Sequence, residues 1–201
     1  MIRIFLILAI SCFLFSCNVK QSNEKHIIVK NGIFPKDSLQ IKAYQLEEAV
    51  AKNNYFVFFN LFPSTFEEFI NLYSFDDDKG EMPLYHTYEE HINFFFKSYE
   101  LNKNSFIPKI FNLIKNGHWE ADATGILRDN TESFVLSHAQ EIIDYLNTKP
   151  DEEATGFWHF ILDGRENTHL RNDFIKALYS KINSLDSKQG ALLRQTFKQM
   201  Y

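Results

Sequence analysis

The sequence predicts an all-α protein, either a compact helical bundle or a stack of helical hairpins, with about six to eight helices. Apolar residues recur at three- and four-residue intervals through residues 38–201, which places them on one face of each helix. Polar residues of the kinds that cap helices separate these apolar stripes. No period with recurring residue identity is present, so a true solenoid of repeats is not predicted.

The first predicted helix begins at Ser38, and no glycine or proline follows until Pro63. Its apolar face is formed by Leu39, Ala43, Leu46, Ala49 and Val50. The apolar run from Tyr55 to Phe62 comes next, and a short run of this kind fits either a buried strand or the buried end of a helix. We favour the helix.

Two capping boxes predict where the next two helices begin. In a capping box, a hydroxyl and a carboxylate three residues apart satisfy backbone donors at the helix start. One box lies within Ser64–Glu68 and the other within Thr87–Glu90. The apolar faces behind them are Phe66, Phe69, Ile70, Tyr73 and Ile92, Phe95, Phe96, Tyr99.

The C-terminal half repeats the order of cap, apolar stripe and break. One predicted helix ends at Asn116-Gly117, where the glycine would adopt a left-handed conformation. Another begins at Pro150 and ends at Gly164. Further helices are predicted to begin at Asn130-Thr131, Asn167-Thr168 and Asp186–Gln189. Near the N-terminus, residues 26–35 contain β-branched residues and the pair Asn31-Gly32, which are compatible with a short strand, a turn or a β-hairpin.

Residues 1–16 have the pattern of an export signal. Arg3 precedes about a dozen almost wholly apolar residues, which end at the small Ser16 beside Cys17. The run is shorter than the roughly 20 apolar residues that span a bilayer. Leu14-Phe15-Ser16-Cys17 resembles the lipobox of bacterial lipoproteins, in which an aliphatic residue stands three before the cysteine and a small one directly before it. A plain secretory signal and an uncleaved anchor are the alternatives.

The lipobox resemblance implies cleavage before Cys17 and attachment of acyl chains to that residue. Residues 17–25 would then be the lipidated cysteine and a tether, and residues 26–201 a single helical domain. The membrane would be contacted through the lipid on Cys17. Because Asn18 rather than aspartate follows the cysteine, the resemblance implies the outer membrane of a Gram-negative cell, facing the periplasm.

Composition excludes several classes of function. From Cys17 onwards the chain has 20 Lys and Arg against 26 Asp and Glu, a net charge of −6, which argues against nucleic acid as a partner. Lysines such as Lys109 are expected to be solvated. Since Cys12 would leave with the signal and Cys17 would carry lipid, we expect no disulfide and no cysteine-bound metal. The 21 phenylalanines are expected to supply the packing.

Three polar runs are candidate partner-binding surfaces. The acidic run Asp76, Asp77 and Asp78 departs from the spacing of a calcium-binding EF-hand and is either a solvated turn or a docking surface for a basic protein. The run 163–169 follows Trp158 and contributes Asp163, Arg165, Glu166 and His169. The similar run 116–122 contributes Trp119. For the last two runs, helix capping and local ion pairs are the alternative.

Catalysis finds little support in the sequence. No His-Glu-x-x-His zinc motif, Gly-x-Ser-x-Gly elbow or glycine-rich phosphate loop is present, so we expect neither a metal nor a cofactor. Dispersed residues could still build a hydrolase site, and the candidates are His118, Glu120, His138 and His159. Convergence of three or more of His91, His118, His138, His159 and nearby carboxylates in one pocket would favour the enzyme. The sequence favours instead a lipid-anchored envelope protein that acts by protein binding, as an adaptor in envelope assembly or as an immunity-type lipoprotein that blocks a toxin in the periplasm.

Overall fold

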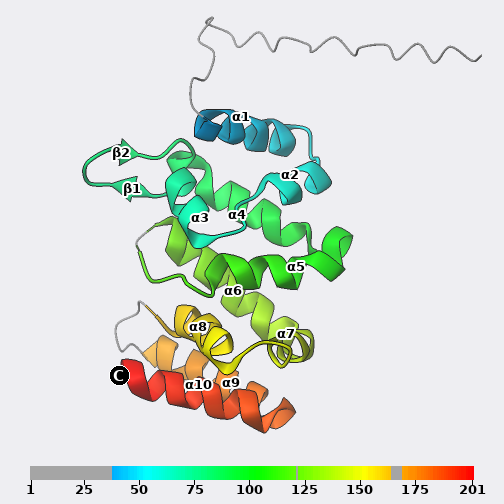
Figure 1. Ribbon diagram of the computed structural model, residues 1–201, viewed down its shortest axis with the longest axis vertical. Coiled ribbons are helices and arrows are strands. Elements are labelled where there is room, and N and C mark those ends of the chain that lie inside the picture. Colours follow the sequence, from blue (N-terminus) through cyan, green and yellow to red (C-terminus); the bar gives the residue numbers. More distant parts are fainter. Residues whose placement is uncertain (1–37, 121, 164–168) are drawn as a thin grey trace, which may run out of the picture. The chain divides into compact units, whose positions relative to one another are not determined.

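The computed structural model describes residues 38–120, 122–163 and 169–201, with side chains from residue 173 onwards in the last of these segments. This part of the chain holds ten α-helices, one 3₁₀ helix and one two-stranded antiparallel hairpin, which confirms the all-α prediction (Figure 1). The elements are α1 (Ser38–Ala51), α2 (Tyr55–Leu61), α3 (Phe66–Tyr73), β1 (Phe75–Asp76), β2 (Gly80–Glu81), η1 (Tyr85–Thr87), α4 (Tyr88–Lys97), α5 (Tyr99–Ile114), α6 (Ala123–Ser137), α7 (Ala139–Leu146), α8 (Asp151–Leu162), α9 (His169–Leu185) and α10 (Ser187–Met200).

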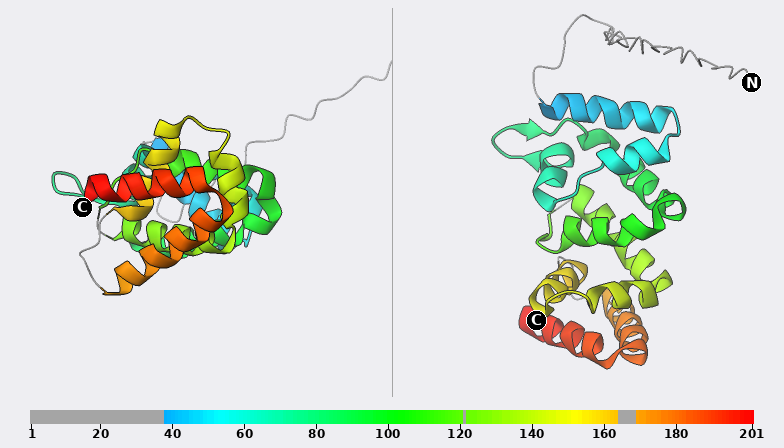
Figure 2. Two further views of the ribbon diagram at one scale, coloured as in Figure 1. Left: turned by 90° about the horizontal axis from the view of Figure 1, so that it is seen from below. Right: turned by 45° about the vertical axis from the view of Figure 1, so that its right-hand side comes forward.

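The helices follow one another as layers, each packed mainly on its neighbours (Figures 1 and 2). Helix α1 packs on α2, and α2 to α4 pack on α5 and α6. The pair α5 and α6 packs in turn on α7 and α8, and these on α9 and α10. The arrangement corresponds to the predicted stack of helical hairpins, and the described residues form one compact unit.

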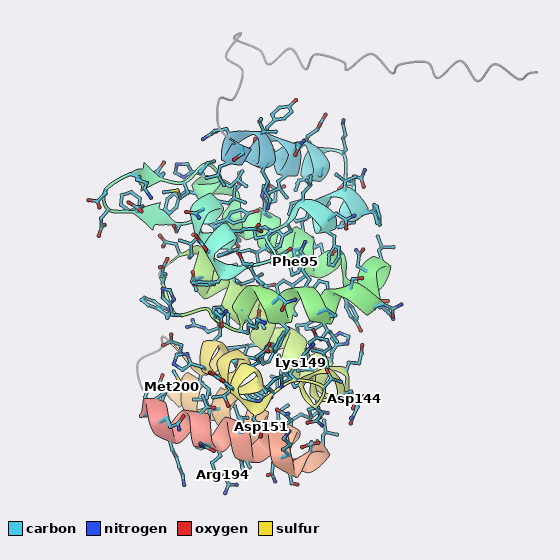
Figure 3. All side chains as sticks on the ribbon, in the orientation of Figure 1. Phe95, Asp144, Lys149, Asp151, Arg194 and Met200 are labelled. Carbon is cyan, nitrogen blue, oxygen red and sulfur yellow. The ribbon has the colours of Figure 1, made fainter. Side chains whose placement is uncertain are left out.

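Phenylalanine rings fill the space between the layers. The rings of Phe62 and Phe95 stack with centroids 4.3 Å apart, and Phe95 stacks on Phe106 at 4.7 Å. All three side chains are fully buried, and Figure 3 shows Phe95 in the interior between α4 and α5. Each such ring removes on the order of 150–250 Å² from water. The aromatic residues thus form the core that the composition led us to expect.

Several predicted helix starts are confirmed and others are wrong. Thr65 caps α3 by accepting a hydrogen bond from the Glu68 backbone N–H at 3.2 Å, and Asp186 caps α10 in the same way through Gln189. The box at Thr87 does not form, because the 3₁₀ helix η1 precedes α4 and the Thr87 hydroxyl donates to the carbonyl of Leu84 instead. The run Tyr55–Phe62 is helical up to Leu61.

The predicted start at Asn130-Thr131 is wrong because α6 begins at Ala123, so both residues lie inside the helix. Their side chains donate back to the carbonyls of Ile126 and Leu127, a mid-helix alternative to capping. His138 leaves helical geometry at φ −121° and divides the predicted helix into α6 and α7, which is one reason why the helices outnumber the prediction.

The stop at Gly117 has a different cause from the predicted one. Positive φ among the described glycines occurs at Gly80, not at Gly117. A Cβ on Gly117 would lie 2.7 Å from the Phe160 ring and 2.9 Å from the Phe66 ring. Close packing therefore requires glycine at this position. Gly164 and the N-terminal run 26–35 lie outside the described residues.

A buried polar network joins α8 and α10. The Trp158 indole N–H donates to the side-chain oxygen of Gln189 at 3.0 Å, and the Gln189 amide donates to the Asn147 side-chain oxygen at 2.8 Å. Trp158 and Gln189 are both fully buried. The Asn147 amide in turn donates to Asp186, the N-cap residue of α10. The start of α10 is therefore fixed to the loop after α7 and to the core of α8.

We expect Gln189→Leu to lower the free energy of unfolding by about 1–3 kcal/mol, because it leaves the buried Trp158 N–H without an acceptor. The matched control is Gln195→Leu, an exposed position on the same helix, for which we expect a change within about 0.5 kcal/mol. Urea unfolding followed by circular dichroism measures both changes. Equal midpoints for the two variants would show that the network does not stabilise the fold.

Candidate functional site

The structure brings two of the predicted partner-binding loops together and places the third beside them. Hydrogen bonds and ring contacts connect the β1–β2 hairpin, η1, the loop after α5 and the end of α8, and these elements lie along one side of the helices (Figure 1). We call this surface the acidic edge. It consists of Phe75, Asp76, Asp77, Asp78, Glu81, Tyr85, Trp119, Glu120, Asp122 and Asp163.

The three aspartates of the β1–β2 hairpin differ in what their side chains contact. One Asp76 carboxylate oxygen accepts the backbone N–H groups of Lys79 at 2.9 Å and Asp78 at 3.0 Å, and these two bonds hold the pKa of the Asp76 carboxyl below its usual range. Asp76 thus shapes the turn. Asp77 and Asp78 are exposed, and Phe75 beside them is 53% exposed. These three side chains are available to a partner.

Tyr85 connects the hairpin to the loop after α5. Its hydroxyl donates to an Asp122 carboxylate oxygen at 2.8 Å, and its ring meets the Phe75 ring edge-on with centroids 6.1 Å apart. The bond to Asp122 raises the pKa of the Tyr85 hydroxyl. Asp122 has φ +55°, a conformation that non-glycine residues seldom adopt. The tyrosine therefore holds a strained turn.

The backbone of Trp119 is fixed by Asp163, at the end of α8. The Trp119 backbone N–H donates to an Asp163 carboxylate oxygen at 2.7 Å, although the residues are 44 positions apart. The buried Arg128 donates to the backbone carbonyl of Asp163 at 2.6 Å. The Trp119 side chain remains 45% exposed. The Asp163 carboxylate therefore positions an exposed tryptophan, a role that differs from the helix capping and local ion pairs considered for its loop.

The other predicted residues of the α8–α9 loop cannot be placed. Arg165 and Glu166 lie outside the described residues, as does the His169 side chain at the start of α9. The C-terminal residue does reach the end of α8, because the Tyr201 hydroxyl donates to the Leu162 carbonyl at 3.1 Å.

A polar groove of about 850 Å³ adjoins the acidic edge, between α3 and the end of α5. Its polar lining residues include Glu67, Asn71, Asn112, Lys115, His118 and Glu120. His118 Nε2 lies 3.2 Å from a Glu120 carboxylate oxygen. The sequence did not reveal this groove, because Asn71 and Asn112 lie on different helices and neither belongs to a motif.

His118 lines this groove together with Glu67 and Glu120, whereas His91, His138 and His159 lie elsewhere. His91 is buried against the Tyr73 hydroxyl at 3.1 Å, and burial lowers its pKa to about 4. His138 lies 3.1 Å from Glu141, which also accepts from Tyr99 at 2.7 Å, and burial is the main reason why the pKa of Tyr99 rises to about 12. His159 is half-buried on α8. Within the described segments, no group of three or more His, Cys, Asp or Glu side chains has the geometry of a metal site.

Lys109 is not the solvated lysine that was expected. Its ammonium donates to the Phe59 carbonyl at the end of α2 and lies 4.9 Å from the centre of the Phe59 ring. Burial lowers the pKa of Lys109 to about 8. The contact satisfies a carbonyl of the last turn of α2 and fixes α2 on α5.

Cys17 and the whole predicted leader and tether lie outside the described residues. Among the helices that are described, none combines the length and the apolar character needed to cross a bilayer. Comparisons of the chain with protein-family models, with curated proteins and with solved structures give no match.

Proposed function

We propose that this protein is anchored in the cell envelope by lipid on Cys17 and acts by binding a basic protein through the acidic edge. The observation that carries the proposal is Trp119, an exposed tryptophan whose backbone is fixed by Asp163 on a surface that carries seven carboxylates. An envelope adaptor and an immunity-type lipoprotein that blocks an incoming toxin are the two forms of this function. The lipobox supports the anchor, and the outer membrane facing the periplasm is the proposed location.

The geometry of Trp119 suits an interface. Tryptophan and tyrosine are enriched among the residues that contribute most to protein binding, since a large ring buries apolar area at a low cost in conformational entropy. The bond to Asp163 fixes the loop before any partner arrives. Less freedom is then lost on binding, which favours affinity.

Charge supplies the second argument. Residues 38–163 contain nine Lys and Arg against 21 Asp and Glu, a net charge of −12. A field of this sign speeds the approach of a basic partner and repels acidic proteins. We therefore propose a partner with a basic binding surface and an association rate that falls as the salt concentration rises.

Photocrosslinking in cells tests this function. A crosslinking amino acid replaces Trp119 in one full-length chain and Ile41 in another, because both positions are 45% exposed and Ile41 lies on α1, which contributes no residue to the acidic edge. We expect a discrete crosslinked species from position 119 that is absent from position 41 and weakens when Asp77 and Asp78 are changed to lysine. The same pattern at both positions, or no species at 119, would refute partner binding at the acidic edge.

A further inference from the structure

The last two helices carry a net charge opposite to that of the rest of the described chain. Residues 169–201, which form α9 and α10, contain six Lys and Arg and two Asp and Glu, a net charge of +4, whereas residues 38–163 carry −12. The two acids are engaged locally. Asp186 accepts the Gln189 backbone N–H at 2.9 Å as the N-cap of α10, and Asp173 lies 3.6 Å from Lys176. Asp173 therefore compensates Lys176, and Lys188 pairs with Asp151 of α8 at 2.7 Å, which leaves Lys181, Arg194 and Lys198 without an ion pair among the described residues.

Arg194 and Lys198 form the exposed centre of this basic surface. They are four residues apart on α10, so they lie on one face of the helix, and neither makes an ion pair with the described residues. Together with Tyr179 and Asn183 of α9 they line a groove of about 400 Å³. The Arg194 guanidinium lies 4.5 Å from the centre of the Tyr179 ring, and this contact orients it. Figure 3 shows Arg194 on the outer side of α10.

An apolar slot of about 170 Å³ adjoins the groove and shares Tyr179 and Arg194 with it. Its other lining residues are Leu162, Ile175, Leu193 and Phe197. An apolar cavity of about 150 Å³ is large enough for a benzene molecule, so this slot is of the right size for one phenyl ring. Seen end-on, α9 and α10 are the outermost layer, and no described element covers them (Figure 2, left). The surface suits a segment that carries a phenyl ring next to negative charges.

The same chain supplies such a segment. The β1–β2 hairpin extends from the side of the helices (Figure 1) and carries the half-exposed Phe75 followed by Asp77 and Asp78, whose carboxylates make no ion pair with described residues. We propose that the protein associates head to tail, with the hairpin of one copy docked on the α9–α10 groove of the next. Phe75 enters the apolar slot, and Asp77 and Asp78 face Arg194 and Lys198 of the second copy.

The contact uses two different surfaces, so it is heterologous. A docked pair leaves one hairpin and one groove free, and each can bind a further copy. The assembly therefore grows with concentration unless it closes into a ring. Since the attraction is between exposed charges, salt weakens it. Trp119 is outside the contact, whereas the hairpin is also part of the acidic edge. Self-association and binding of a basic partner therefore compete at the hairpin only.

Matched charge reversals test the proposal on the full-length chain in non-ionic detergent. One variant is Arg194→Glu with Lys198→Glu, and the other is Asp77→Lys with Asp78→Lys. Either variant alone pairs like charges at the contact, and we expect its dissociation constant for self-association to rise at least about tenfold. A mixture of the two restores opposite charges at each contact. Sedimentation velocity at low salt is expected to show association of the wild type and of the mixture, but not of either variant alone.

Three results of this experiment would contradict the proposal. A wild-type chain that stays monomeric as its concentration rises, variants that associate like the wild type, or a mixture that stays monomeric would each overturn head-to-tail docking. The altered side chains are exposed, so circular dichroism melting curves are expected to match the wild type and exclude misfolding as the cause. Trp119→Ala is expected to associate normally, which keeps this test separate from that of the partner-binding function.

Discussion

Gly156→Ala is expected to lower the free energy of unfolding by about 3 kcal/mol, which is near the upper end for adding one carbon to a packed interior. Gly156 lies in α8, and a Cβ there would approach the Lys115 carbonyl oxygen to 2.2 Å. The neighbouring atom belongs to the backbone, so no side chain can rotate away. To admit the methyl group, α8 and the end of α5 must move apart. The segment that leads from α5 to Trp119 is then expected to shift with the end of α5.

Gly125→Ala is the matched control because it makes the same chemical change in a helix where a Cβ meets nothing within 4 Å. There the loss of glycine's freedom in the unfolded chain is expected to stabilise the protein by about 0.5 kcal/mol. Thermal unfolding of both variants checks the two signs, with about 2–4 °C per kcal/mol for a chain of this size. A melting temperature for Gly156→Ala equal to that of the wild type would show that α5 and α8 are not packed this closely.

Cys17→Ser is expected to abolish lipid attachment. Each buried methylene of an acyl chain contributes about 0.8 kcal/mol, so two or more chains hold a protein on a membrane stably where one chain does not. The intact mass of the wild-type protein is expected to equal that of residues 17–201 plus acyl chains. The variant is expected to lack the acyl mass and to be lost from the outer-membrane fraction.

Cys12→Ser provides the control, since Cys12 lies within the proposed leader, which cleavage before Cys17 would remove. This variant is expected to keep the mature mass and location of the wild type. If mass spectrometry found the leader still attached to the wild-type chain, or found no difference between the wild type and Cys17→Ser, the anchor and the envelope location would both have to be abandoned.

The sequence predicted helices well where apolar periodicity and a local cap agree. Thr65 and Asp186 are examples, because a residue three positions away completes each cap. The prediction was wrong where the same residue types make a different bond. Thr87 donates to a carbonyl before it and Thr131 donates to one inside its helix, and local sequence does not distinguish these uses of a hydroxyl from capping.

For the candidate site, the sequence supplied residues but not their arrangement. Trp119 and Asp163 were selected for their chemical types, but the bond between them joins loops 44 positions apart and depends on how α5 packs on α8. The pairing of Tyr85 with Asp122 likewise has no local pattern. The basic character of α9 and α10 is visible in the sequence, but the total net charge of −5 conceals it.

The layered packing has a consequence for how the protein opens. Because α9 and α10, apart from each other, contact mainly α7 and α8, we expect this last pair to detach while the rings around Phe95 stay packed. Amide hydrogens in α9 and α10 would then exchange with solvent through partial opening, and those in α4 and α5 only when the whole chain unfolds. A second copy bound at the groove of α9 and α10 would slow the exchange of the amide hydrogens in these two helices. Hydrogen–deuterium exchange would therefore report assembly residue by residue.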